Sequence, residues 1–126
     1  MADTSVGAVW DAGALIKFEK GTSELLRAHV RRKDTIIVPT SALAQVWRDG
    51  ARQARLAMLL RASFVEEASL DSAAARGIGA ILARCSHSDI VDVHVALLAR
   101  QRRLPILTTD VDDLRAVDPL LEIVAV

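Results

Sequence analysis

The chain has 126 residues, enough for one domain with a hydrophobic core of its own. Lys plus Arg and Asp plus Glu number 16 each, so no global basic charge indicates nucleic-acid binding, although a local basic patch is compatible with these numbers. Aromatic residues make up only 3% of the chain, which argues against an aromatic platform for stacking bases. Cys85 is the only cysteine, which excludes an internal disulfide framework and a cysteine-rich zinc site.

Targeting and membrane signals are lacking in the sequence. No apolar run reaches the roughly 18 to 20 residues needed to span a bilayer. Residues 1–6 lack the basic region that begins a signal peptide. We therefore expect a cytoplasmic protein without membrane association, folded as one domain over residues 1–126.

Short apolar runs alternate with helical segments along the chain. The expected strands are 6–10, 35–38, 64–65, 104–109 and 122–126. The expected helices are 14–20, 24–32, 40–50, one through Leu56, Leu59 and Leu60, one begun by Asp71 or Ser72, 89–99, and a short helix or turn at 112–114. This alternation predicts an α/β fold with a mainly parallel central sheet and helices on both faces.

Segment 89–99 is apolar except for Asp89, Asp92 and His94, which predicts a buried helix. Ser88 is a candidate N-cap, and Asp89 suits the positive end of the helix dipole. Asp92 would stand one turn inside this helix, where an unpaired carboxylate costs several kcal/mol. Either a cation, a proton or a metal ion compensates its charge, or its carboxylate reaches water from the first turn.

Two other helices have clear apolar faces. Leu43, Val46 and Trp47 share one face of the helix after the second strand, and Gln45 points away from it. A longer stripe predicts that the helix begun by Asp71 or Ser72 packs on the core. Its members are Ala74, Ile78, Ile81, Leu82 and Cys85.

Three carboxylates are expected at one edge of the sheet. Asp11 and Asp110 follow the first and fourth strands, and Asp92 opens the helix that leads into the fourth strand. Ligands of open parallel sheets bind outside the carboxyl ends of the strands. Carboxylates held together need a counter-charge, which Mg²⁺ or Mn²⁺ supplies, and such a site suits phosphodiester hydrolysis. Taken singly, Asp11 and Asp110 are equally compatible with simple helix N-caps.

Three segments carry a resemblance to a known family. Val9-Trp10-Asp11-Ala12-Gly13-Ala14-Leu15 resembles the opening motif of PIN-domain ribonucleases. Segments 88–96 and 107–114 are similar to the later acidic motifs of that family. The likeness covers nearly the whole chain, whose length resembles that of the VapC-type toxins of toxin–antitoxin pairs.

This resemblance implies a Mg²⁺- or Mn²⁺-dependent endoribonuclease that cleaves structured RNA such as tRNA or rRNA. It also implies a homodimer that is neutralised by a VapB-type antitoxin. Asp11, Asp92 and Asp110 match the metal-binding carboxylates of the family, and Asp113 matches a further acidic position. Thr109 is a candidate for a hydroxyl contact in the site, whereas Asp112 is expected to be solvated.

One position departs from the family pattern. VapC-type proteins usually carry a Glu where this chain has Gln45. An amide can hydrogen-bond a water molecule, but it adds no negative charge and cannot act as a general base. Gln45 is therefore kept as a catalytic-site candidate, with weakened metal binding or loss of activity as its expected consequence.

The remaining candidates are arginines and histidines. Arg48, Arg52 and Arg55 form one possible basic rim that would hold RNA phosphates. A second possible rim consists of Arg100, Arg102 and Arg103, and solvated helix faces would give the same patterns. His29, His87 and His94 lack partners at metal-ligand spacing and are expected to be structural.

Two other classes of function remain as alternatives. A catalytically silent PIN-like module that binds RNA or protein is supported by Gln45. A dehalogenase-type phosphatase or a receiver domain would also use an acidic pocket. The phosphatase needs a second Asp two residues after Asp11, where this chain has Gly13. The receiver domain needs a Lys late in the sequence, but no Lys follows Lys33.

Overall fold

The computed structural model describes residues 7–86 and 89–126, which form one five-stranded sheet flanked by helices. The strands are β1 (Gly7–Trp10), β2 (Thr35–Pro39), β3 (Val65–Ala68), β4 (Ile106–Thr108) and β5 (Ile123–Ala125). Their order across the sheet is β3-β2-β1-β4-β5, and every neighbouring pair is parallel. The α/β fold with a parallel sheet is thus confirmed, with β1 at its centre.

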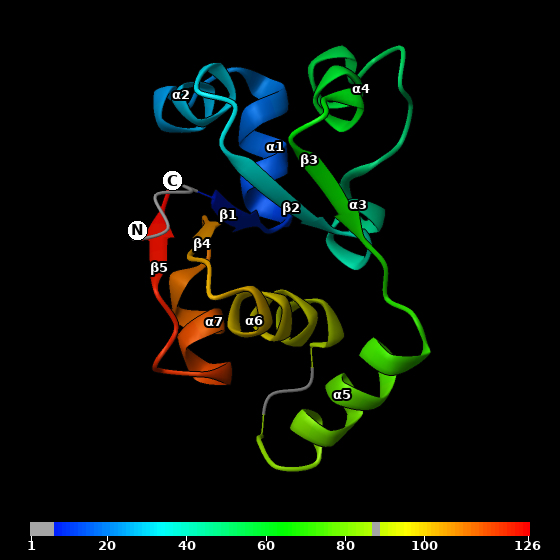
Figure 1. Cartoon of the computed structure of the whole chain (residues 1–126), viewed down its shortest axis with the longest axis vertical. Helices are drawn as coiled ribbons and strands as arrows, with labels where there is room; N and C mark the ends of the chain where they lie inside the picture. Colours follow the sequence, from blue (N-terminus) through cyan, green and yellow to red (C-terminus); the bar gives the residue numbers. More distant parts are fainter. Residues whose placement is uncertain (1–6, 87–88) are drawn as a thin grey trace, which may run out of the picture.

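Helices cover both faces of this sheet (Figure 1). They are α1 (Ala12–Lys20), α2 (Glu24–Arg31), α3 (Thr40–Val46), α4 (Ala54–Arg61), α5 (Ser72–Leu82), α6 (Ile90–Arg102) and α7 (Val111–Val117). Helices α1, α2 and α4 lie on one face, and α6 and α7 lie on the other. Helix α5 packs on α6 on the side away from the sheet (Figure 1). In the described residues, no helix is both long and apolar enough to cross a membrane.

Strand side chains divide between two cores because they alternate between the faces of the sheet. Trp10 and Leu107 pack with α1, α2 and α4. Val9 and Ile106, their neighbours in sequence, pack with α6 and α7. Helix α6 is buried as its apolar sequence predicts, with Val93, His94, Val95, Ala96, Leu98 and Ala99 all inaccessible or nearly so.

The helix expected over 40–50 is shorter than its sequence suggests. Helix α3 ends at Val46, and Trp47 has an extended backbone. The Gln53 side chain explains this early end, since its amide donates to Val46 O (2.8 Å) and accepts from Arg48 N (2.8 Å) and Asp49 N (3.0 Å). Val46 is buried, but Trp47, which was expected on the same apolar face of the helix, is 37% exposed.

Two smaller expectations needed correction, and a third was confirmed. Asp89 is the N-cap of α6 and accepts from Val91 N and Asp92 N, while Ser88 lies outside the described residues. Cys85 lies beyond the end of α5 and is half-buried, so the apolar stripe of this helix stops at Leu82. Asp71 caps α5 by accepting from Ala74 N (2.9 Å), as one of the two expected alternatives.

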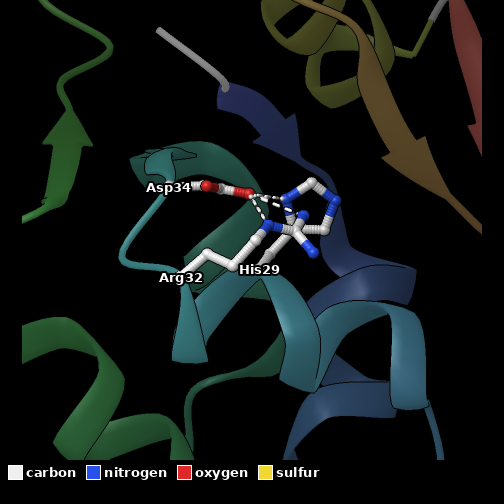
Figure 2. A network of polar contacts seen from close by, with 3 residues as sticks. All are labelled: His29, Arg32 and Asp34. Carbon is white, nitrogen blue, oxygen red and sulfur yellow. Dashed lines mark hydrogen bonds and ion pairs between the residues drawn. The ribbon is translucent and has the colours of Figure 1, made fainter.

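A polar network fixes the turn between α2 and β2 (Figure 2). The buried Asp34 carboxylate accepts from Arg32 Nε (3.2 Å) and Nη2 (2.8 Å), and His29 Nδ1 lies 2.7 Å from the same oxygen. Lys33, between Arg32 and Asp34 in the sequence, has a left-handed backbone with φ 56°, which turns the chain sharply into β2. Because this turn precedes β2, His29 lies at the opposite end of the strand from the acidic edge, in agreement with a structural role.

Candidate active site

The carboxylate of Asp11 is buried at the carboxyl end of the central strand. Asp11 follows Trp10, the last residue of β1, and is the N-cap of α1, where it accepts a hydrogen bond from Ala14 N (3.2 Å). Only 7% of the residue is exposed. Burial raises the pKa of Asp11, whereas the hydroxyl of Thr108 and the backbone N–H groups of Ala14 and Gly13 oppose this shift.

Thr108 joins the first and fourth strands at the site. Its fully buried hydroxyl donates to Asp11 Oδ2 and accepts from Asp110 N (2.8 Å). Thr108 was not among the residues expected in the site from the sequence, whereas Thr109, a candidate for a hydroxyl contact, is exposed and its contact stays a prediction. The alternation of β4 contains the missed signal, because Thr108 shares a face with Ile106 just as Asp11 shares a face with Val9. Both polar side chains therefore extend the row of residues that faces α6.

Thr109 instead limits how closely the loop after β4 approaches α1. A Cβ atom at Gly13 would lie 2.0 Å from Thr109 Oγ1, which is far too close. A glycine is thus required at position 13 for this approach.

Asp92 adds a third carboxylate from the other face of the sheet. It lies in the first turn of α6 and is half-buried, which agrees with a first-turn carboxylate that reaches water. The full burial of α6 starts only at Val93. The negative charge of Asp92 contributes to raising the pKa of both Asp11 and Asp110, so these three carboxylates from different elements share one electrostatic environment.

Asp110 and Asp113 form a carboxyl pair at the start of α7. A side-chain hydrogen bond with Asp113 is the main cause that raises the pKa of Asp110 to about 6, and partial burial and the charges of Asp113, Asp92 and Asp11 act in the same direction. Asp110 occupies the N-cap position of α7 without capping it. Its carboxylate is therefore not committed to the helix end, unlike that of Asp11. Asp112 is exposed, as expected.

The donor set suits a hard divalent cation in its chemistry. Asp11, Asp92, Asp110 and Asp113 present carboxylate oxygens, the ligands that Mg²⁺ and Mn²⁺ prefer. Burial is the main cause of the raised pKa of Asp11 and the hydrogen bond with Asp113 is that of Asp110, and neighbouring carboxylate charges add to both shifts. Over residues 7–86 and 89–126, however, no three His, Cys, Asp or Glu side chains are close enough together to hold a metal ion.

Gln45 lies on α3, which contacts both α1 and α6, the helices that follow Asp11 and carry Asp92. Its side chain is exposed. The structure thus brings the element that carries Gln45 beside the acidic edge, while the direct interaction of Gln45 with the carboxylates stays a prediction.

The two arginine clusters expected from sequence are largely engaged in local contacts. The Arg48 guanidinium donates to Trp47 O (2.7 Å), and Arg52 lies 3.9 Å from the Asp49 carboxylate. In the second cluster, Arg100 pairs with Asp118 and Arg102 pairs with Glu66. His94 is fully buried and its Nδ1 lies 2.6 Å from Ser41 Oγ, in agreement with a structural role, and His87 lies outside the described residues.

Solved structures share this fold at low sequence identity. One is the structure of VapBC2 from Rickettsia felis bound to a DNA fragment from the VapBC2 promoter. A chain of it superposes with a TM-score of 0.71 and 13% sequence identity, over 95% of this chain and 98% of that one. A chain of DNA-bound VapBC from Salmonella typhimurium gives 0.70 and 20% identity over 95% and 98%. A chain of FitAcB from Neisseria gonorrhoeae gives 0.63 and 16% identity over 92% and 95%.

No family model and no curated protein sequence matches the chain. The structural likeness therefore establishes the fold of the VapBC and FitAB chains, which is the PIN-like architecture that the sequence motifs indicated. The likeness covers nearly the full length of both chains.

Replacing Thr108 by Val tests the link between the strands. The variant removes the hydroxyl at nearly constant volume, and it leaves Asp110 N without its acceptor and Asp11 without a donor. We expect the pKa of Asp11 to rise and the free energy of unfolding to fall by about 1–3 kcal/mol. Carboxyl NMR titration and urea denaturation measure these effects. Thr109→Val is the matched control, and an equal effect of both variants would contradict the assignment.

Asp113→Asn tests the carboxyl pair through the pH dependence of stability. The pKa of Asp110 lies at about 6 in the folded protein against an ordinary value of 3.8. The folded state therefore binds more protons between these values, and this pair lowers stability as pH rises from about 4 to about 6. We expect Asp113→Asn to gain in Tm over the wild type across this interval and to keep the gain above it. A difference in Tm that does not change with pH would contradict the pairing.

Proposed function

We propose that this chain is a divalent-metal-dependent endoribonuclease of the PIN-domain, VapC type. The observation that carries the proposal is the meeting of Asp11 and the backbone of Asp110 at the Thr108 hydroxyl, at the carboxyl edge of the sheet, with Asp92 in the first turn of α6 near enough for its charge to act on both. Three isolated N-caps would not need this proximity. The shared fold with VapBC and FitAB chains supports the same reading.

In this proposal, Asp11, Asp92 and Asp110 hold Mg²⁺ or Mn²⁺, and Asp113 adds a further carboxylate beside Asp110. The bound ion would supply an activated water and stabilise charge on the attacked phosphate. Thr108 fixes the Asp11 carboxylate and the backbone of Asp110, so the chain orients two of the ligands before a metal arrives. This preorganisation lowers the cost of assembling the site.

The proposal includes partners and a location. The substrate is structured RNA such as tRNA or rRNA, which Arg48, Arg52 and Thr109 would contact from exposed positions near α3 and α7. A VapB-type antitoxin neutralises the protein, which forms a homodimer in the cytoplasm. The names of the structural neighbours, VapBC and FitAB, support a paired partner.

Gln45 favours one second candidate, a PIN-like module that binds RNA or protein without cleaving. Where VapC-type proteins usually carry Glu, this chain has one negative charge fewer. One negative charge fewer at the acidic edge attracts a divalent cation less strongly, so the cation is bound less tightly.

Cleavage of purified tRNA and rRNA tests the proposed activity. We expect discrete cuts with Mg²⁺ or Mn²⁺, none with EDTA, and a loss of at least about 100-fold in Asp11→Asn, because this change removes a buried ligand charge while keeping the N-cap acceptor. Asp112→Asn, which changes an exposed carboxylate, serves as the control. Absence of cleavage by the wild type under all conditions would contradict nuclease activity and favour the binding module.

Gln45→Glu tests whether the missing charge limits metal binding. We expect the variant to bind Mn²⁺ more tightly by about 3- to 10-fold in calorimetry, since one added carboxylate at an exposed site contributes about 1 kcal/mol. Equal affinities in the two proteins would show that position 45 lies outside the metal field.

A further inference from the structure

An acidic catalytic edge repels the substrate assigned to it, so an RNase built on this fold needs basic residues elsewhere to hold phosphates. Arg100 and Arg102 are paired with Asp118 and Glu66. Arg48 donates to backbone carbonyls of its own segment. These three arginines thus already have protein partners, whereas Arg55, from the first expected rim, lines a different site.

A different basic site lies between α1, α2 and α4, around a cavity of about 260 Å³. Six residues line it, of which three are arginines and none is acidic: Phe18, Gly21, Arg27, Val30, Arg31 and Arg55. In a chain with zero net charge this is a strong local concentration of positive charge. Figure 1 shows α2 and α4 on either side of α1, which brings together arginines that are far apart in sequence.

The fold constructs this site around the end of α1. Gly21 ends α1 at φ 71°, and a Cβ atom there would lie 3.0 Å from the Arg55 guanidinium carbon. The Arg55 guanidinium thus lies close to this glycine and donates to Glu19 O (3.1 Å). These contacts hold one guanidinium at the rim while Phe18 and Val30 provide an apolar wall.

The other two guanidiniums come from α2. Arg31 pairs with Glu24 at the surface, with 62% and 69% of the two side chains exposed. Arg27 is exposed, and its positive charge contributes to lowering the pKa of Glu24. Three arginines thus line one cavity, and Arg31 is paired with the carboxylate of Glu24.

We propose that this cavity, the α1–α2–α4 arginine site, binds a phosphodiester of the RNA substrate, with the apolar wall against its sugar or base. The inference rests on the proposed endoribonuclease function. Guanidinium groups bind phosphate oxygens through two parallel hydrogen bonds, which favours a phosphate as the ligand of this cavity. Helix α1 spans about 14 Å from Asp11 to this site, so one RNA can reach both.

The proposed nuclease activity favours RNA over an acidic protein segment, because the cavity and the acidic edge lie at opposite ends of the same helix. An RNA with one phosphodiester at the acidic edge can place another in this cavity and gain binding energy there. A single compact cavity also fits one nucleotide unit better than an extended acidic peptide, which would need a continuous groove.

Fluorescence anisotropy with labelled tRNA in EDTA tests the proposal without cleavage. Arg27→Ala/Arg31→Ala removes two exposed arginines, so the fold is retained. We expect Kd to rise about 10-fold or more at low salt, and the slope of log Kd against log salt to fall by about one to two. Arg76→Ala/Arg84→Ala, which removes two exposed arginines from α5 and the segment after it, is the matched control and should change Kd less than about twofold.

Equal effects of the two double variants, or none, would overturn the arginine site while leaving cleavage at the carboxylates to be judged by its own assay. Complete absence of tRNA binding by the wild type would instead count against the proposed function as well. Unchanged tRNA affinity together with polyglutamate binding that only Arg27→Ala/Arg31→Ala loses would also overturn the proposal, and would assign the cavity to an acidic protein segment.

Discussion

The burial of one carboxylate, Asp11, at the end of the central strand constrains much of the remaining structure. A buried carboxylate is costly unless donors surround it. Here the donors come from two elements: the N-terminal turn of α1 and the hydroxyl of Thr108 on the neighbouring strand. The cap of α1, the side-chain link between the ends of β1 and β4, and the position of Asp110 therefore share the same few hydrogen bonds.

Because side chains alternate along each strand, the polar residues of the acidic edge lie on the same side of the sheet as the apolar residues that pack against α6. Val9 and Ile106 face α6 within the sheet, and Asp11 and Thr108 continue these rows beyond its last apolar layer. The first turn of α6 lies on the same face, and it brings Asp92 within electrostatic reach of Asp11. A shift of β4 by one residue would turn Thr108 toward α1 and α2 and separate the carboxylates from their shared hydroxyl.

Features governed by local chemistry were predictable from the sequence. All five strands were expected near their observed positions, and Asp71 was among the expected caps. Asp11, Asp92 and Asp110 were expected at one edge because parallel strands end together. Features that depend on a distant side chain were missed. The end of α3 is set by Gln53, and Trp47 is exposed because its backbone has already left the helix.

The position of Thr108 on the α6 side of the sheet was within reach of sequence reasoning, since alternation from Ile106 decides it. Of the arginine site, sequence reasoning singled out only Arg55, because α2 and α4 are brought together by the packing of both on α1.

Charge is separated along α1 even though the whole chain is neutral. The helix dipole explains part of this separation, because carboxylates are favoured at the start of a helix and cations at its end. Asp11 caps the start, and Lys17, Lys20 and the guanidinium of Arg55 surround the last turn. Arg27 is not explained in this way, since it lies in the middle of α2 and makes no ion pair within the described part of the chain. Folding alone does not require a cation at this position. An exposed arginine beside an apolar cavity contributes most when an anion occupies the cavity, which is the physical reason to regard the site as a binding surface.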